Sequence, residues 1–141
     1  MAIKQTNIFP LDKQPRKAVG VKFPFSEFAI SGSGATPFKS NYTTADQIKS
    51  NLAIYFTTNP GERPLNPNYG GGLSLLLFEQ LTSNTFEDVK KIIADSLAIY
   101  FPEVELKKLE VFEGIENNTL KVVMSYTVFN NPDTLELNFN A

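Results

Sequence analysis

The sequence predicts an α+β fold, in which two long helices and a short one pack on a small antiparallel or mixed sheet. Apolar residues recur at helical spacing in two segments that end before residue 102. From residue 108 onward they alternate with polar residues at strand spacing. Because the helices come first and the strands follow as a group, the order is typical of α+β rather than alternating α/β folds. The length of 141 residues fits a single domain.

The composition limits the chemistry available to the chain. It has no histidine and no cysteine, which excludes imidazole bases, thiolate nucleophiles, disulfides and the usual zinc sites, so we expect neither a metal nor a cofactor. The formal net charge is −2 and there is no basic run, so nucleic acid is not an expected partner. The longest apolar run, 75–78, is too short to cross a bilayer, and the N-terminus lacks the apolar stretch of a signal peptide. We therefore expect no membrane partner and no export through the Sec pathway.

Residues 1–40 are predicted to form an extended N-terminal arm, followed by one α+β domain over 41–141. The arm has no helical period and contains four prolines, but it also carries apolar anchors: Ile8, Phe9, Phe23, Phe25, Phe28 and Phe38. Disordered tails are usually poor in aromatic residues, so these anchors dock the arm either on its own domain or on a neighbour. The SGSG at 31–34 is predicted to be a flexible joint.

The two long helices carry capping signals. Thr44 with Gln47 forms a capping box for a helix over 44–57, which Asn59-Pro60-Gly61 ends. LSLLLFEQL (73–81) predicts a short apolar helix that is buried on most sides. Asn84 with Glu87 starts the second long helix, and Pro102 lies just beyond its end. The apolar stripe of this helix is Phe86, Val89, Ile92, Ile93, Leu97 and Tyr100.

Three strands are predicted after the helices. Leu109 and Val111 alternate with charged residues, and a turn at Asn117-Asn118 leads into the second strand. Its apolar face is Leu120, Val122, Met124, Tyr126 and Val128. NNPD (130–133) predicts the next turn. Leu135, Leu137 and Phe139 then form a short last strand, which we expect at an edge of the sheet.

The loop NPGERPLNPNYGGG (59–72) combines rigidity with recognition chemistry. Its three prolines fix φ, and its last three glycines permit positive φ or close backbone approach. Arg63 offers a fork of donors for loop carbonyls or a carboxylate, and Tyr69 can bury its ring with its hydroxyl still bonded. A phosphate-binding loop would need Lys and Ser or Thr after the last glycine, but Leu73-Ser74 follows here. A rigid inter-helix connector and a protein-docking element remain open.

The loop and its surroundings resemble the small baseplate wedge and sheath-initiator proteins of contractile phage tails, a family labelled lysozyme-like, with relatives in type VI secretion baseplates. The pattern is R-P-x-x-P-x-[FY]-G, then a leucine and an apolar run ending in Phe-Glu. The matching residues are Arg63, Pro64, Pro67, Tyr69, Gly70, Leu73, Phe78 and Glu79. GVKFPF (20–25) resembles the family's entry segment, and the resemblance covers about residues 19–139. Where the family often has Glu-Pro-Arg, this chain has Phe101-Pro102-Glu103, so the partner contact at that corner differs.

The resemblance implies a structural role in the baseplate of a virion assembled in the host cytoplasm. The implied partners are other wedge proteins, tail sheath subunits and tube-proximal baseplate proteins, with six copies around a sixfold tail. Arg63 would organise the loop with Glu79 as counter-ion, Pro64, Pro67 and Gly70 would hold its shape, and Pro102 would mark the partner corner. Leu135, Leu137 and Phe139 would form a strand exchanged with the sheath. A type VI secretion baseplate component is the alternative within the family.

A lysozyme-like glycosidase is the alternative from another class. The phage-lysozyme spacing is Glu, eight residues, Asp, five residues, Thr; Glu79 and Asp88 fit it, but Ala94 stands in the third position. Such an enzyme needs two carboxylates about 5–9.5 Å apart across a sugar-binding cleft. Asp88 in the first turn of a helix is explained by the helix dipole. We therefore expect no enzymatic activity.

Overall fold

The computed structural model describes residues 12, 17–23, 29–31, 34–36, 38–78, 83–113 and 119–140. They belong to two compact units, Met1–Ile54 and Tyr55–Ala141. Several expectations lie outside the described residues: the anchors Ile8, Phe9, Phe25 and Phe28, the counter-ion Glu79, and the turn at Asn117-Asn118.

The first unit contains two short antiparallel pairs and most of helix α1. β1 (Gly20–Val21) pairs with β4 (Ser40–Asn41), and β2 (Ala29–Ser31) pairs with β3 (Gly34–Thr36). Ser31 pairs with Gly34. The two residues between them lie outside the described residues, so the flexible joint at SGSG stays a prediction. The side-chain amide of Asn41 is buried and donates to Gln47 Oε1 and Ser50 Oγ, both at 3.0 Å, which ties β4 to the helix.

Helix α1 spans Thr44–Thr57, as predicted, but its N-cap lies one residue earlier than expected. Thr43 Oγ1 accepts from the backbone N–H of Asp46 at 3.2 Å and donates to Asp46 Oδ2 at 2.7 Å. The N-cap is thus Thr43, and the Asp46 carboxylate accepts from its hydroxyl. Gln47 is absent from the cap because its side chain is bonded to Asn41 and Asn51.

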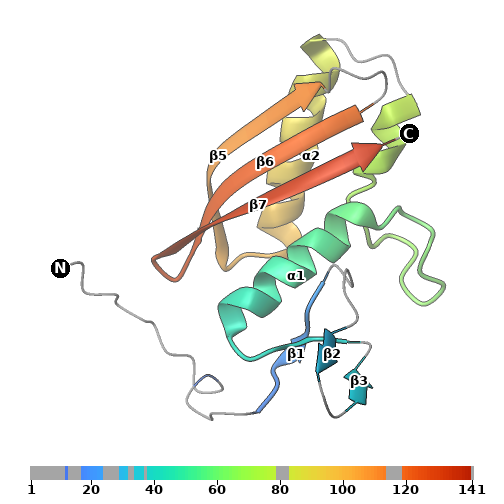
Figure 1. Cartoon of the computed structure of the whole chain (residues 1–141). Coiled ribbons are helices and arrows are strands. Elements are labelled where there is room, and N and C mark those ends of the chain that lie inside the picture. The colour runs from blue at the N-terminus through green and yellow to red at the C-terminus, as the bar shows by residue number, and fades with distance from the viewer. Residues whose placement is uncertain are drawn as a thin grey trace. The chain divides into compact units, whose positions relative to one another are not determined.

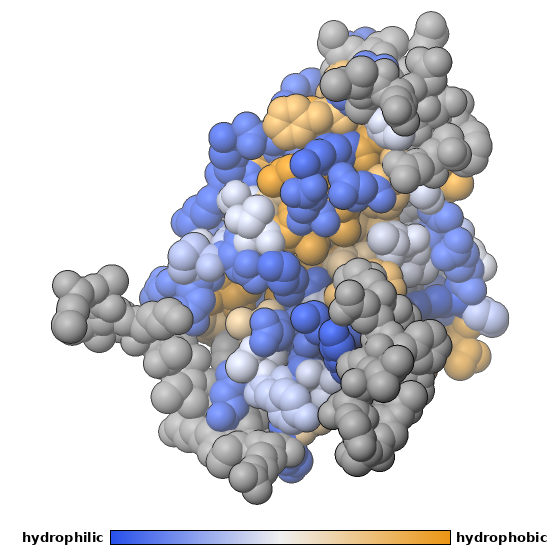
Figure 2. All heavy atoms as spheres, in the orientation of Figure 1, coloured by the Kyte–Doolittle hydropathy of each residue, from blue (hydrophilic) through white to orange (hydrophobic). Residues whose placement is uncertain are grey.

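The second unit is built on a three-stranded antiparallel sheet in the order β5-β6-β7 (Figure 1). The strands are β5 (Val104–Glu113), β6 (Thr119–Val128) and β7 (Asn131–Asn140), and helix α2 (Ser83–Tyr100) lies across one face next to β5. The predicted apolar face of β6 is buried, as are Val89, Ile93 and Leu97 of α2. Hydrophilic side chains gather over the visible face of the sheet, with hydrophobic ones beside them (Figure 2). Helices followed by an antiparallel meander confirm the predicted α+β class.

The β6–β7 hairpin turns earlier and more tightly than predicted. Val128 pairs with Asn131, so the turn consists of Phe129 and Asn130, whose φ angles are 46° and 67°. Two positive φ angles match a type I′ turn, which suits the twist of the flanking strands. Pro132 and Asp133 therefore belong to β7, and the last strand has ten residues rather than a few. It lies at an edge of this sheet, as expected.

The short apolar segment also differs from its prediction. Leu73–Phe78 forms a 3₁₀ helix, η2, that packs against β7. Leu73 is fully buried, but half of the Leu75 surface is exposed. On α2, Ile92 and Tyr100 at the border of the predicted stripe are also partly exposed.

Candidate partner-docking site

The loop over 58–72 is fastened to the last turn of α1. The backbone N–H of Gly71 donates to the carbonyl of Tyr55 at 2.8 Å, and that of Gly72 donates to the carbonyl of Thr58 at 3.2 Å. Carbonyls at a helix C-terminus have no partner within the helix, so the returning loop supplies one. The contact is close: a Cβ on Gly70 would lie 2.5 Å from the Thr58 carbonyl oxygen, and one on Gly71 would lie 2.6 Å from Phe56 Cδ1. The expected close backbone approach is confirmed.

Inside the loop, hydrogen bonds close successive turns. Gly61 N–H donates to the Pro67 carbonyl at 2.8 Å across the loop, and Asn66 and Tyr69 N–H groups each donate to the carbonyl three residues earlier. Asn59 donates to Glu62 from its backbone and from its side chain, both at 3.0 Å, and accepts from Ser74 Oγ at 2.6 Å. From the sequence, Asn59 was expected only to help end the helix, and neither Glu62 nor Ser74 was expected to hold the loop. The three-residue spacing of Asn59 and Glu62 was the only signal available.

Arg63 and Tyr69 meet on the outside of this framework. The guanidinium carbon of Arg63 lies 3.9 Å from the centroid of the Tyr69 ring, a cation–π stack. The contact of Arg63 is thus with a ring face, whereas donation to carbonyls or a carboxylate was the expectation from sequence. Tyr69 is half-buried, with Arg63 over one face of its ring.

Tyr69 belongs to an aromatic cluster that joins the loop to both long helices. Its ring meets the edge of Tyr55 at 5.1 Å and that of Tyr100 at 6.2 Å. Tyr55 also contacts Phe56, Tyr100 and Phe101 with centroids 5.0–5.6 Å apart. Such geometries contribute about 0.5–1.5 kcal/mol per pair beyond area burial. The cluster therefore packs the base of the loop against the end of α1 and the end of α2.

A buried hydroxyl pair lies at the centre of the cluster. Tyr55 is 2% exposed, and its hydroxyl donates to Ser96 Oγ at 3.3 Å. Burial raises the pKa of Tyr55 from its ordinary value, although the bond to Ser96 opposes the rise. The hydroxyl is therefore a structural group held in its neutral form.

The Pro102 corner lies beside the same cluster. Phe101 N–H donates to the Leu97 carbonyl at 3.0 Å and Val104 N–H to the Phe101 carbonyl at 2.9 Å, so exposed Pro102 sits in a tight turn from α2 to β5. Because the ring of Tyr100 contacts the ring of Tyr69, the Pro102 corner lies next to the loop. The predicted residues Arg63, Pro64, Pro67, Tyr69, Gly70 and Pro102 thus fall on connected elements. Leu135, Leu137 and Phe139 are separate from them: they are buried on the core face of β7.

The outer part of the loop is exposed and carries one large apolar side chain. Residues 60–68 are all exposed, and Leu65 has 101% of its side-chain reference surface open to solvent. Among the described residues no group of acidic side chains is arranged to hold a metal ion, and no helix is long and apolar enough to span a membrane.

The comparisons with known proteins agree on one family. The model of the family described as baseplate wedge protein gp25 matches residues 43–133. Baseplate wedge protein gp25 of Enterobacteria phage T4 is 34% identical over 89 residues, which cover 63% of this chain and 67% of that protein.

Two solved structures share the fold at 22% identity. A crystal structure described as a "putative tail lysozyme" from Geobacter sulfurreducens has a TM-score of 0.61, covering 70% of this chain and 91% of that one. A chain of the anti-feeding prophage baseplate has a TM-score of 0.56, covering 70% of this chain and 77% of that one. The family match, which spans the loop, the aromatic cluster and most of the sheet, shows that this chain belongs to the baseplate wedge protein gp25 family, structural components of contractile-tail baseplates.

Proposed function

We propose that the chain docks on other baseplate wedge proteins through the loop over 58–72 and anchors the tail sheath through the edge of its sheet. The docking proposal rests on the difference between the base of the loop and its outer part. Hydrogen bonds and aromatic contacts hold the base in place, while Leu65 in the outer part is fully exposed to solvent. A preorganised loop loses little conformational entropy on binding, so most of the burial of Leu65 contributes to affinity.

Sheath anchoring rests on the position of β7. It lies at the edge of the sheet, and its apolar residues Leu135, Leu137 and Phe139 are buried in this chain. We therefore expect β7 to stay in place and to receive a strand, rather than to leave its sheet. The same role fits a phage tail with six copies per baseplate and a bacterial injection machine, and the neighbouring genes distinguish the two.

A glycosidase is not supported. Asp88 is an exposed residue near the start of α2, and Ala94 stands where the lysozyme pattern has threonine. Purified protein should leave peptidoglycan uncleared, and Glu79→Gln should change nothing in that assay.

Electron microscopy of particles tests the proposal. Deleting the gene should yield tails without sheath, while sheathed tails in the deletion would refute the anchoring role. Leu65→Asn should lower incorporation into baseplates by about five- to thirtyfold, because it removes an apolar anchor worth roughly one to two kcal/mol. Phe112→Asn is the matched control, since this exposed aromatic lies on β5, away from the loop. Normal incorporation of Leu65→Asn would exclude the loop as the docking element.

A further inference from the structure

The two compact units of the chain carry opposite net charges. Seven basic and three acidic residues give Met1–Ile54 a formal charge of +4, whereas six basic and twelve acidic residues give Tyr55–Ala141 a formal charge of −6. The overall charge of −2 therefore conceals a strong asymmetry between the units. Surfaces of opposite charge attract each other at long range and fix the orientation in which two proteins meet.

The basic unit exposes apolar side chains on the outer face of its β1–β4 pair. Gly20 and Asn41 are partners in that pair, and both lie against the side chain of Gln47 on α1. Because successive residues of a strand point to opposite faces, Val21 and Tyr42 point away from α1. Val21 is 46% exposed and Tyr42 is 55% exposed. This face of the pair is therefore open to a partner.

Lysines flank these apolar side chains. Lys17 and Lys22 are exposed before and after β1, and together with Val21 and Tyr42 they form what we call the ribbon patch. The described acidic residues of this unit, Asp12 and Asp46, are engaged elsewhere. Asp12 accepts from the N–H and hydroxyl of Thr44, and Asp46 accepts from the hydroxyl of the N-cap. The ribbon patch thus combines apolar surface with positive charge.

Helix α2 of the acidic unit presents a complementary stripe, which consists of Asp88, Ile92, Asp95 and Ile99. Their spacing of four, three and four residues places them within about 60° of the helix circumference. Ile92 is 37% exposed, Ile99 is 71% exposed, and both aspartates are exposed. Lys91, which is also exposed, offsets one of the two negative charges. We call these four residues the α2 stripe.

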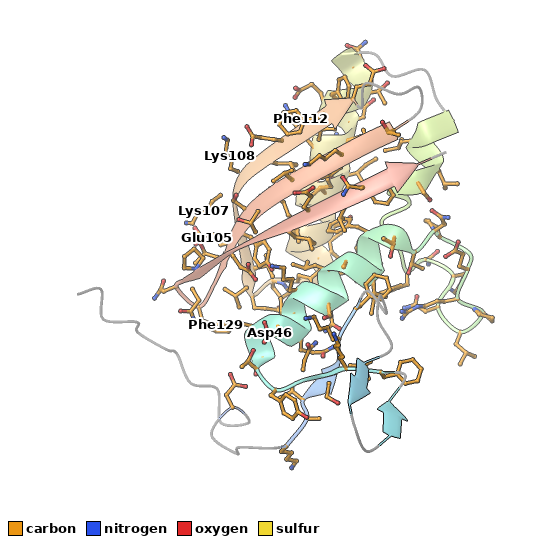
Figure 3. All side chains as sticks on the ribbon, in the orientation of Figure 1. Asp46, Glu105, Lys107, Lys108, Phe112 and Phe129 are labelled. Atoms are coloured by element: carbon orange, nitrogen blue, oxygen red, sulfur yellow. The ribbon has the colours of Figure 1, made fainter. Side chains whose placement is uncertain are left out.

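Acidic side chains on the sheet are less suited to attract a basic surface. Glu105 pairs with Lys107 at 2.8 Å and Glu110 pairs with Lys108 at 2.9 Å, all on β5 (Figure 3). An acidic group that already has a lysine partner gains little from a second cation at the protein surface. The α2 stripe, in contrast, brings exposed apolar side chains together with an excess of negative charge.

We propose that the ribbon patch of one copy docks on the α2 stripe of a second copy of this chain. The apolar side chains of the two surfaces would cover one another, and the lysines would face the aspartates. Because the two surfaces differ, each copy can bind one neighbour through each of them, and the repeated contact can close a ring. The β1–β4 pair precedes residues 43–133, which match the family, so this contact goes beyond the proposed docking and anchoring functions.

Disulfide trapping between two single-cysteine variants tests the contact in assembled particles. The chain has no cysteine, so Tyr42→Cys and Ile99→Cys each introduce one thiol. Particles assembled from a mixture of both variants should yield a disulfide-linked pair of chains after mild oxidation. Phe112→Cys replaces Ile99→Cys in the control mixture, and the linked pair should then fall by at least about tenfold. Phe112 and Phe86 line the same hollow near the start of α2, and Phe86 is about 20 Å along the helix from Ile99.

A disulfide between these variants requires two chains, so contact of the patch with the stripe of its own chain cannot produce it. Particles that contain both variants but yield no linked pair would overturn the proposal. Equal yields in the test and control mixtures would do the same. A disulfide to a different tail protein would show that another partner occupies the surface, and it would also overturn the proposal.

Charge reversal in purified protein provides a second test. The parent should self-associate in sedimentation velocity experiments, and salt should weaken this association. Lys17→Glu with Lys22→Glu, or Asp88→Lys with Asp95→Lys, gives both surfaces of a chain the same sign, so each double variant should associate at least about tenfold more weakly. Mixing the two double variants should restore association, because the reversed patch of one matches the reversed stripe of the other.

Urea unfolding of each double variant confirms that it is folded before it is mixed. If the patch instead bound the stripe within its own chain, mixing would restore nothing. That result, or a parent that stays monomeric at every concentration, would refute contact between copies.

Discussion

Replacing Gly70 by alanine should destabilise the protein far more than the same change at Gly61, although both glycines lie in one loop. Gly70 has φ of 130°, and its new Cβ would lie 2.5 Å from the Thr58 carbonyl oxygen. Gly61 has φ of 91°, and its Cβ would have no neighbour within 4 Å. The pair therefore separates the cost of a positive φ from the cost of a collision.

The magnitudes follow from these two terms. At Gly61 a positive φ costs an alanine about 1–2 kcal/mol, and loss of glycine's freedom in the unfolded chain offsets about 0.4–1 kcal/mol of it. At Gly70 the φ is less accessible still, costing about 1–3 kcal/mol, and the overlap adds about 1–3 kcal/mol. The Thr58 carbonyl would also have to move away from Gly72 N–H, a bond of 3.2 Å. We expect about 1 kcal/mol for Gly61→Ala and 3–5 kcal/mol for Gly70→Ala.

Urea unfolding followed by circular dichroism measures both variants. With a slope of about 1–3 kcal/mol per molar urea, Gly70→Ala should lower the midpoint by more than about 1 M. Gly61→Ala should shift it by less than half as much. Equal losses at the two positions would refute the reasoning, because they would mean that the loop is not held against the end of α1.

Three further predictions concern single contacts. Arg63→Ala should lower the free energy of unfolding by only about 0.5–1 kcal/mol, the range of an exposed cation–π stack. A strong assembly defect in this folded variant would therefore indicate that Arg63 contacts a partner. Arg63→Lys, which keeps the charge, is the control. Tyr55→Phe should cost about 1 kcal/mol near neutral pH by removing the bond to Ser96. Because burial raises the pKa of Tyr55, the parent should lose stability as pH rises above 10 and the variant should lose less of it, as pH-dependent unfolding would show. Phe129→Asn should raise the urea midpoint by the equivalent of about 0.5–1 kcal/mol, since asparagine suits a positive φ better than phenylalanine; a lower midpoint would mean that the ring stabilises the hairpin.

The sequence predicted elements better than contacts. The end of α1 followed from Asn59-Pro60-Gly61, because these residues cannot continue a helix. The hairpin turn was misplaced because NNPD is a stronger turn signal than Phe129-Asn130, and the register is set by which side chains of β7 reach the core. Arg63 and Tyr69 were picked out singly, but their stack depends on the turns between them. The contact of Tyr55 with Tyr100 joins residues 45 positions apart, which no local pattern in one sequence can reveal.

Stability and the proposed docking depend on different residues of the same loop. Gly70 and Tyr69 face the helix end and the aromatic cluster, so changes there act on the folded state before any partner is present. Leu65 contacts solvent alone, so a change there can act only when a partner arrives. A rigid connector needs only the first group, whereas the proposed docking element also uses the exposed Leu65. Because the two groups are separate, stability measurements on the isolated chain can serve as the control for every assembly experiment on the loop.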